Sequence, residues 1–170
     1  MALIKTVRGK TPSIHESSYL AENATVIGDV HIGEHCSIWF NTVIRGDVNS
    51  INIGDKVNIQ DGVVVHCTLE KSVTVIGNKV SIGHNAIIHG CEIRDKVLIG
   101  MGAIVMDNSI IESEVVIAAG TVVPENSVLR SGGVYAGIPA RRIKDLDSKL
   151  LEGEIERIAE NYLKYASWYK

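Results

Sequence analysis

The segment VIGDVHIGEHCSIWFNTVI, residues 26–44, places an aliphatic residue at every sixth position. Val26, Ile32, Ile38 and Ile44 form this unbroken series. A period of six fits neither the 3.6-residue repeat of an α-helix nor the simple alternation of a long strand. It indicates a short strand, a corner and another short strand, repeated along the chain. The same period returns further along, at Ile53, Ile59 and Val65, at Ile76, Ile82 and Ile88, and at Ile99 and Val105.

A second regularity supports the same fold. Small or β-branched residues stand two positions before most of the periodic aliphatic residues, and glycine often follows them, as at Gly33 and Gly83. Each short strand buries its apolar side chain only against the coils above and below, so the repeats must stack. Aromatic residues make up only 5% of the chain, which suits a narrow aliphatic core. We therefore predict an all-β fold, a parallel β-helix with three repeats to each triangular coil.

The composition changes near the C-terminus. From residue 147 to residue 170 the apolar residues recur at helical spacing with charges between them, which predicts an amphipathic helix. We expect a β-helix domain over residues 1–140 and a C-terminal α-helix over residues 141–170 that packs on it. The apolar positions of this segment are Leu150, Leu151, Ile155, Ile158, Tyr162, Tyr165 and Trp168.

The overall composition argues against several classes of function. The formal net charge is −3 and no Lys/Arg-rich run occurs, so neither a nucleic-acid partner nor a membrane surface is expected. The first residues lack the apolar stretch of a signal peptide, and a cytoplasmic location is expected. The three cysteines have no close spacing that would indicate a disulfide framework or a zinc knuckle.

Two insertions interrupt the repeat, and removing them aligns a set of polar residues. The period lengthens by three residues near 48–50 and by five residues at 68–72. With these removed, Arg45, His66 and His89 occupy one outward position in successive coils. Because adjacent coils lie about 4.8 Å apart, His66 and His89 are close enough to share a metal ion.

A third histidine lies on another face. By the same count Asp61 and His84 share one position on the preceding face, one coil apart, with Gln60 beside Asp61. His84 therefore points away from the other two histidines and would reach a metal site only in an adjacent molecule. Three neutral imidazoles with an open fourth position form the arrangement of catalytic zinc sites.

These motifs resemble those of the γ-class carbonic anhydrases. The resemblance covers nearly the whole chain and rests on IRGD at 44–47, NIQD at 58–61, GH at 83–84, IIHG at 87–90 and YAGIPAR at 135–141, together with His66. It implies a left-handed β-helix, a homotrimer and a metal ion at each subunit interface. The ligands would be His66 and His89 of one subunit and His84 of the next. Zn²⁺ is the expected metal, and Fe²⁺ or Co²⁺ would also accept three imidazoles.

The resemblance also implies an activity and roles for further residues. The activity would be that of a zinc-dependent lyase of the carbonate dehydratase type, the reversible hydration of carbon dioxide to bicarbonate by a metal-bound hydroxide. Gln60 would orient that hydroxide. Arg45 and Asp47 would tie the subunits together, and Asp61 would support the same interface.

Some residues depart from the family pattern. The best-studied members carry a glutamate just after the segment that matches 44–47 and another in an acidic loop after the first metal histidine. This chain has Val48 at the first place, and its loop offers only Glu70. Since that loop glutamate shuttles protons, we expect slow proton export and modest activity.

Other interpretations also fit the sequence. Related folds include acyl-CoA thioesterases and acyltransferases, and a metal-binding homologue with weak or no catalysis would fit the same histidines. Arg45 and Asp47 would then form only a structural salt bridge. Tyr135 either borders the site or packs in the fold.

Overall fold

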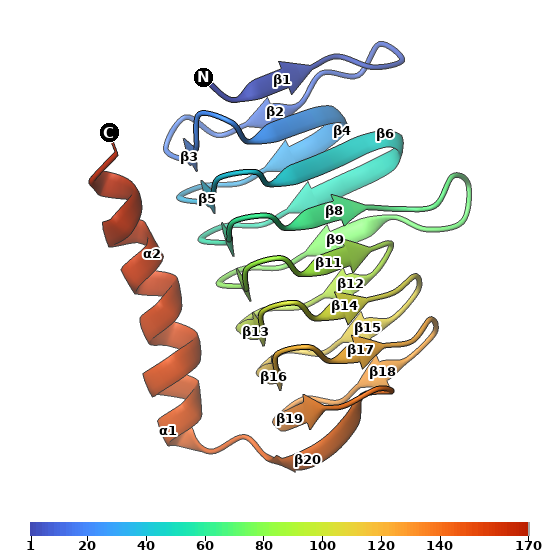
Figure 1. Cartoon of the computed structure of the whole chain (residues 1–170), viewed down its shortest axis with the longest axis vertical. Coiled ribbons are helices and arrows are strands. Elements are labelled where there is room, and N and C mark those ends of the chain that lie inside the picture. The colour runs from blue at the N-terminus through green and yellow to red at the C-terminus, as the bar shows by residue number, and fades with distance from the viewer. Residues whose placement is uncertain (170) are drawn as a thin grey trace.

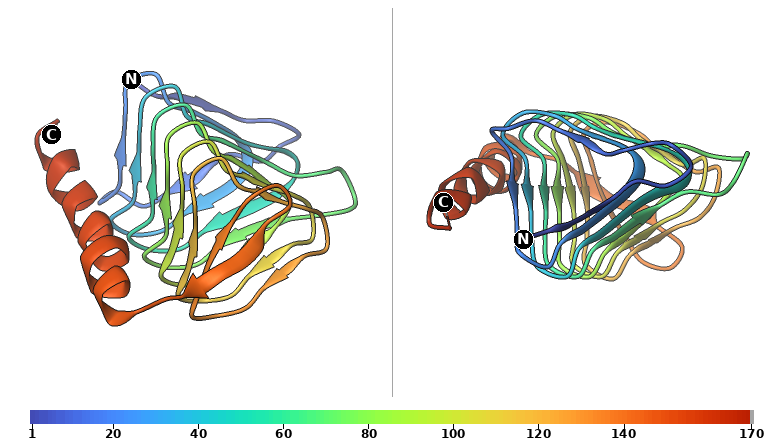
Figure 2. Two further views of the ribbon diagram at one scale, coloured as in Figure 1. Left: turned by 60° about the horizontal axis from the view of Figure 1, so that its bottom comes forward. Right: turned by 90° about the horizontal axis from the view of Figure 1, so that it is seen from above.

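The computed structural model describes residues 1–169, and in it the chain winds into a stack of parallel β coils (Figure 1). The coils have three faces, and Figure 2 shows the stack seen along its axis. The first face contains β1 (Leu3–Lys5), the first parts of β4 (Thr25–Ile32) and β6 (Val43–Ile53), β8 (Val64–His66), β11 (Ile87–His89), β14 (Ile104–Val105) and β17 (Val122–Val123).

The long strands β4 and β6 turn a corner and join the first face to the second in one 12-stranded sheet. The second face holds β2 (Ser13–Ile14), the remainder of β4 and β6, β9 (Thr74–Ile76), β12 (Glu92–Ile93), β15 (Ile110–Ile111) and β18 (Val128–Leu129). An 8-stranded sheet forms the third face, with β3 (Tyr19–Leu20), β5 (Ser37–Ile38), β7 (Asn58–Ile59), β10 (Ser81–Ile82), β13 (Val97–Ile99), β16 (Val115–Ile117), β19 (Gly133–Ala136) and β20 (Arg141–Asp145).

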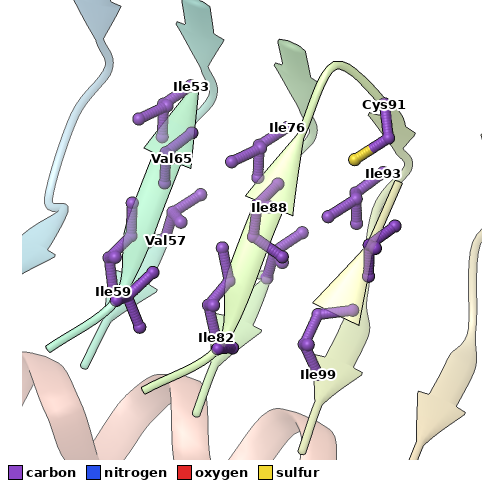
Figure 3. Packing of buried hydrophobic residues seen from close by; sticks show 14 of the residues in the cluster. Ile53, Val57, Ile59, Val65, Ile76, Ile82, Ile88, Cys91, Ile93 and Ile99 are labelled. Atoms are coloured by element: carbon purple, nitrogen blue, oxygen red, sulfur yellow. The ribbon is translucent and has the colours of Figure 1, made fainter. Parts of the chain in front are cut away.

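The periodic aliphatic residues fill the interior. Ile59, Ile82 and Ile99 lie above one another on the third face and are fully buried, as the register of β7, β10 and β13 requires. Figure 3 shows equivalent columns at the other corners. Burial of each such side chain is worth about 1.5–3 kcal/mol relative to an exposed one. The predicted parallel β-helix is therefore confirmed.

Both insertions lie where the repeat predicted them. Gly28 pairs with Gly46 but Val30 pairs with Ile51, so β6 carries three extra residues at this corner. The five-residue insertion lies in the loop between β8 and β9, where the carbonyl of Thr68 accepts hydrogen bonds from the next turn of the loop. Figure 2 shows this loop, in green, projecting from the stack on the side away from the helix.

The C-terminal segment returns along the outside of the coils (Figure 1). β20 pairs antiparallel with β19, and the helical part then begins with α1 (Ser148–Leu150), continues as the π-helix η1 (Leu151–Glu156) and ends with α2 (Arg157–Ser167). Asp147 caps the first turn by accepting from the amide of Leu150 at 2.8 Å. The predicted helix is confirmed, although residues 141–145 extend the sheet and Lys170 lies outside the described residues. The domain division at residue 140 stays a prediction.

Aromatic residues hold the helix against the third face. Trp39, which follows β5, packs edge-on against Tyr162 of α2 with ring centroids 5.4 Å apart. Lys96 adds an ion pair to Glu156 at 3.3 Å. Residues 1–169 contain no helix that is both long and apolar enough to cross a membrane.

Candidate metal site

Adjacent coils bring His66 and His89 together. The two residues are direct partners in the ladder between β8 and β11, and both point outward from the first face. Nδ1 of His66 lies 3.2 Å from Nε2 of His89. Their side chains are 16% and 31% exposed, so the pair is shielded but open to a ligand on one side. The expected histidine column is confirmed.

The other nitrogen of each ring meets a carboxylate. Nε2 of His66 lies 3.1 Å from Asp47, and Nδ1 of His89 lies 2.7 Å from Asp107. A neutral imidazole that donates its N–H to a carboxylate keeps its lone pair on the other nitrogen. Nδ1 of His66 and Nε2 of His89 are therefore the nitrogens left to bind a metal, and they are the two that face each other.

This spacing fits a metal ion. With Zn–N bonds of about 2.0 Å, two ligand nitrogens of a tetrahedral site lie about 3.3 Å apart. The 3.2 Å between Nδ1 of His66 and Nε2 of His89 matches that edge. Carboxylates that hold the second nitrogen are the usual outer contacts of metal-binding histidines.

Burial favours the neutral imidazole of His66 beside an ionised Asp47. Burial lowers the pKa of His66 below its ordinary value of 6.5, against the opposing effect of Asp47. Burial acts to raise the pKa of Asp47, but hydrogen bonds from Arg45 and His66 outweigh it and lower that pKa. Arg45 pairs with Asp47 at 2.5 Å. The neutral ring is the form that binds metals.

Gln60, Asp61 and His84 form a second group at the end of the third face. Nδ1 of His84 lies 2.9 Å from a carboxylate oxygen of Asp61, which leaves Nε2 as the free nitrogen. Gln60 is buried and donates to the side chain of Asn58 at 3.1 Å. With His84 it lines a cleft of about 390 Å³ between the coils and α2. Tyr162 also lines this cleft, and burial together with the charge of Asp61 raises the pKa of Tyr162 to about 12.

The two groups lie at opposite edges of the first face. Asp61 precedes β8 in its coil, whereas His66 ends that strand. In the part of the chain that the structure describes, no three His, Cys, Asp or Glu side chains are arranged to hold one metal ion. We name the two groups as candidate parts of one metal site. The two-histidine half-site is made of Arg45, Asp47, His66, His89 and Asp107, and the one-histidine half-site of Gln60, Asp61 and His84.

Tyr135 belongs to neither half-site. It lies in β19, several coils beyond the histidines, with its side chain 7% exposed in the hydrophobic core. Its hydroxyl donates to the carbonyl of Arg130 at 3.0 Å. Of the two interpretations of Tyr135, the contacts within this chain support packing.

Asp107 is the site residue that sequence reasoning missed. It lies one coil beyond His89 and one position further along the strand than the histidine column, so a search restricted to that column passes over it. A search for carboxylates within one coil of each histidine would have found it. Ser72, the partner of Asp107, has no such signal because it lies inside an insertion.

The fold and the repeat define the class. Residues 11–46 and 90–125 match the family model described as bacterial transferase hexapeptide (six repeats), and residues 29–67 and 73–106 match the hexapeptide repeat of succinyl-transferase. The chain is thus a hexapeptide-repeat protein.

Similarity to known proteins extends over most of the chain. The chain is 45% identical to the carbonic anhydrase of Geobacillus kaustophilus, over 99% of this chain and 91% of that protein. It is 40% identical to γ carbonic anhydrase 1 of Arabidopsis thaliana mitochondria, over 96% of this chain. This chain spans 60% of the length of that plant protein. Within the hexapeptide-repeat class, the chain belongs to the γ-class carbonic anhydrase-like family.

Solved structures with the same fold carry transferase names. A putative acetyltransferase from Bacillus cereus superposes with a TM-score of 0.96 at 37% identity, over 99% of this chain and 96% of that one. A hexapeptide transferase family protein from Anaplasma phagocytophilum gives a TM-score of 0.94 at 38% identity, over 99% of this chain and 98% of that one. The fold alone therefore does not select one reaction.

Proposed function

We propose that this protein catalyses the reversible hydration of carbon dioxide to bicarbonate at a metal ion held between subunits of a homotrimer. The observation that carries the proposal is the pair of free nitrogens of His66 and His89, 3.2 Å apart and each backed by a carboxylate. Relatives named carbonic anhydrase, at 45% and 40% identity, support the reaction.

The positions of the two half-sites support a metal site at the interface between two subunits. A head-to-tail contact places one edge of a face against the opposite edge of the next molecule, and a rotation of about 120° between neighbours closes such contacts into a ring of three. Val64 and Ile87 lie on the first face beside the histidines and are 39% and 38% exposed. Contact with a second subunit would bury these side chains, and burial of apolar surface favours association.

His66 and His89, with His84 of the partner subunit, would hold the metal. Zn²⁺ is the proposed ion, with Fe²⁺ or Co²⁺ as alternatives that three imidazoles also accept. A divalent metal in such an open site lowers the pKa of water to about 7, which supplies a nucleophile at neutral pH.

The chain's own residues would then position the reactants. Asp47 and Asp61 hold the rings of His66 and His84 so that the free nitrogens keep a fixed direction. The amide of Gln60 is fixed by Asn58 and would orient the attacking oxygen. Arg45 neutralises Asp47 and would tie the subunits together.

Stopped-flow measurement of carbon dioxide hydration tests the proposal directly. The purified protein would be assayed after loading with zinc and, anaerobically, with iron. We expect hydration that disappears when a chelator removes the metal. If trimer that is replete with either metal shows no hydration above the buffer rate, the proposed reaction is wrong.

Acyl transfer or hydrolysis of an acyl-CoA is the second candidate. It is supported by the transferase names of the two solved structures at TM-scores of 0.96 and 0.94. Three histidines paired with carboxylates favour the metal-dependent hydration over it. Acyl-CoA hydrolysis assayed on the same preparations distinguishes the two, and a metal-binding homologue without turnover would be inactive in both assays.

A further inference from the structure

A chain of hydrogen bonds joins His89 to the loop between β8 and β9. Oδ2 of Asp107 accepts from Nδ1 of His89 at 2.7 Å, and the hydroxyl of Ser72 donates to Oδ1 of the same carboxylate. The Ser72 hydroxyl in turn accepts from the backbone amide of Thr68 at 3.0 Å. The Asp107 side chain is only 14% exposed, so solvent screens these contacts weakly.

The backbone next to His89 leaves room for the side chains that form these hydrogen bonds. Gly90 has φ +59°, and a Cβ atom at this position would collide with both the Ser72 hydroxyl and the Asp107 carboxylate. The space that these two side chains occupy therefore exists only because residue 90 is glycine.

Further contacts lock the same region. The hydroxyl of Thr74 donates to the carbonyl of His66 at 2.7 Å and accepts from the amide of Gly90 at 3.0 Å. Asn49 donates to the carbonyl of Ser72 at 2.9 Å. These bonds hold the base of the loop against both histidine strands.

We propose that Asp107 and Ser72 are positioning residues of the metal site. Asp107 fixes His89 as the Nδ1–H tautomer, so that Nε2 faces the free nitrogen of His66. Ser72 holds the Asp107 carboxylate in that orientation and ties the loop of residues 68–72 to it. This inference rests on the proposed metal site and adds to it two residues that take no part as ligands.

The hydrogen bonds of Asp107 to His89 and Ser72 connect the loop to the proposed metal site. Because the loop is bonded to the carboxylate that orients His89, a metal ion that fixes the ring also stabilises the loop in the position that these hydrogen bonds hold. Lys71 is exposed next to Ser72 and provides a cleavage point for trypsin. Metal binding should therefore slow cleavage after Lys71.

The test compares four variants of the full chain with the wild type. Asp107→Asn keeps the shape but removes the charge, Asp107→Ala removes the contact, and Ser72→Ala removes the support of the carboxylate. Asp95→Asn is the matched control, since Asp95 also bridges neighbouring coils by accepting from the amide of Asn78 at 2.7 Å, away from both half-sites. Zinc affinity is measured by competition with a chromophoric chelator, with the melting temperature recorded for each protein.

We expect Asp107→Asn and Asp107→Ala to weaken zinc affinity by roughly 10- to 100-fold. Ser72→Ala should cause a smaller loss and remove the protection of Lys71 by zinc. Asp95→Asn should lower the melting temperature without changing affinity. In the metal-free wild type, nitrogen NMR of His89 should show the Nδ1–H tautomer, and Asp107→Ala should lose that preference.

The outcomes separate this inference from the proposed function. If folded Asp107→Ala binds zinc within twofold of the wild type, Asp107 is not a positioning residue. If Asp95→Asn weakens affinity as much as Asp107→Asn does, the effect is one of general stability and the inference fails. A wild type that binds no divalent metal would instead overturn the proposed site itself.

Discussion

The ring of His66 stands against the ring of His89 with the Nδ1 and Nε2 atoms 3.2 Å apart. His84, the other candidate ligand, is held by Asp61 at the opposite edge of the first face. One chain therefore offers two adjacent nitrogens at one place and a single nitrogen at another. A metal ion bound by all three histidine nitrogens must therefore join two molecules.

Each of the substitutions His66→Ala, His84→Ala and His89→Ala should remove most of the bound metal. Loss of one of three protein ligands leaves a weak site. His31→Ala is the matched control, because His31 is exposed on β4 away from both half-sites. Metal content after dialysis is measured by mass spectrometry. A ligand variant that keeps the occupancy of the control would show that its histidine was wrongly assigned.

Mixing two defective variants should restore metal binding. A His84→Ala chain keeps the two-histidine half-site, and a chain carrying both His66→Ala and His89→Ala keeps the one-histidine half-site. In a ring of three, each mixed trimer contains about one interface with both intact halves. Co-refolded mixtures should therefore bind about one metal per mixed trimer, whereas either parent alone binds almost none.

The same mixture provides a control for refolding. Two differently tagged His84→Ala proteins both lack the one-histidine half-site. Mixing them should therefore restore no metal binding. Light scattering confirms that the refolded species are trimers. Absence of restoration in correctly formed mixed trimers would argue against a site shared between subunits.

The repeat made most of the fold predictable because a strict period leaves little freedom. Once Val65 and Ile88 are assigned to the same core column, the pairing of His66 with His89 follows from strand geometry. Asp61 and His84 follow in the same way. The repeat located the insertion of residues 68–72 but not the path of its loop, since no period fixes the course of a loop. Ser72 reaches Asp107 through that loop, and this part of the site became visible only in three dimensions.

Two buried thiols should make the protein less stable in alkali. Burial raises the pKa of Cys36 from 9.0 to about 11 and that of Cys91 from 9.0 to about 12. Below pH 9 the folded and unfolded chains both keep these protons, so the thiols do not lower the free energy of unfolding. Between pH 9 and these raised values only the unfolded chain releases them, and the free energy of unfolding falls.

Urea unfolding at a series of pH values from 8 to 10.5 measures this effect. Each thiol should lower the free energy of unfolding by up to about 1.4 kcal/mol per pH unit above 9. The double variant Cys36→Ala/Cys91→Ala serves as the control, because it lacks both thiols and should show a shallower slope. Equal slopes for the two proteins would mean that other groups cause the alkaline loss.

Proton export should limit turnover if the protein hydrates carbon dioxide. Val48, an apolar residue, follows Asp47 of the two-histidine half-site, and the short loop offers only Glu70, which is exposed near its tip. No carboxylate of the loop is thus held next to the histidines. We expect a modest kcat that rises with the concentration of a small buffer such as imidazole, whereas kcat/KM stays nearly constant because it reports the attack on carbon dioxide.

Two substitutions separate the proton step from the chemical step. Gln60→Ala should lower kcat/KM, since the buried amide is expected to orient the attacking oxygen, and buffer should not rescue it. Glu70→Gln should leave kcat/KM unchanged and lower kcat only at low buffer concentration if Glu70 carries any of the protons. A fast kcat that does not depend on buffer, and that survives Glu70→Gln, would reveal another route for the proton and would contradict the prediction.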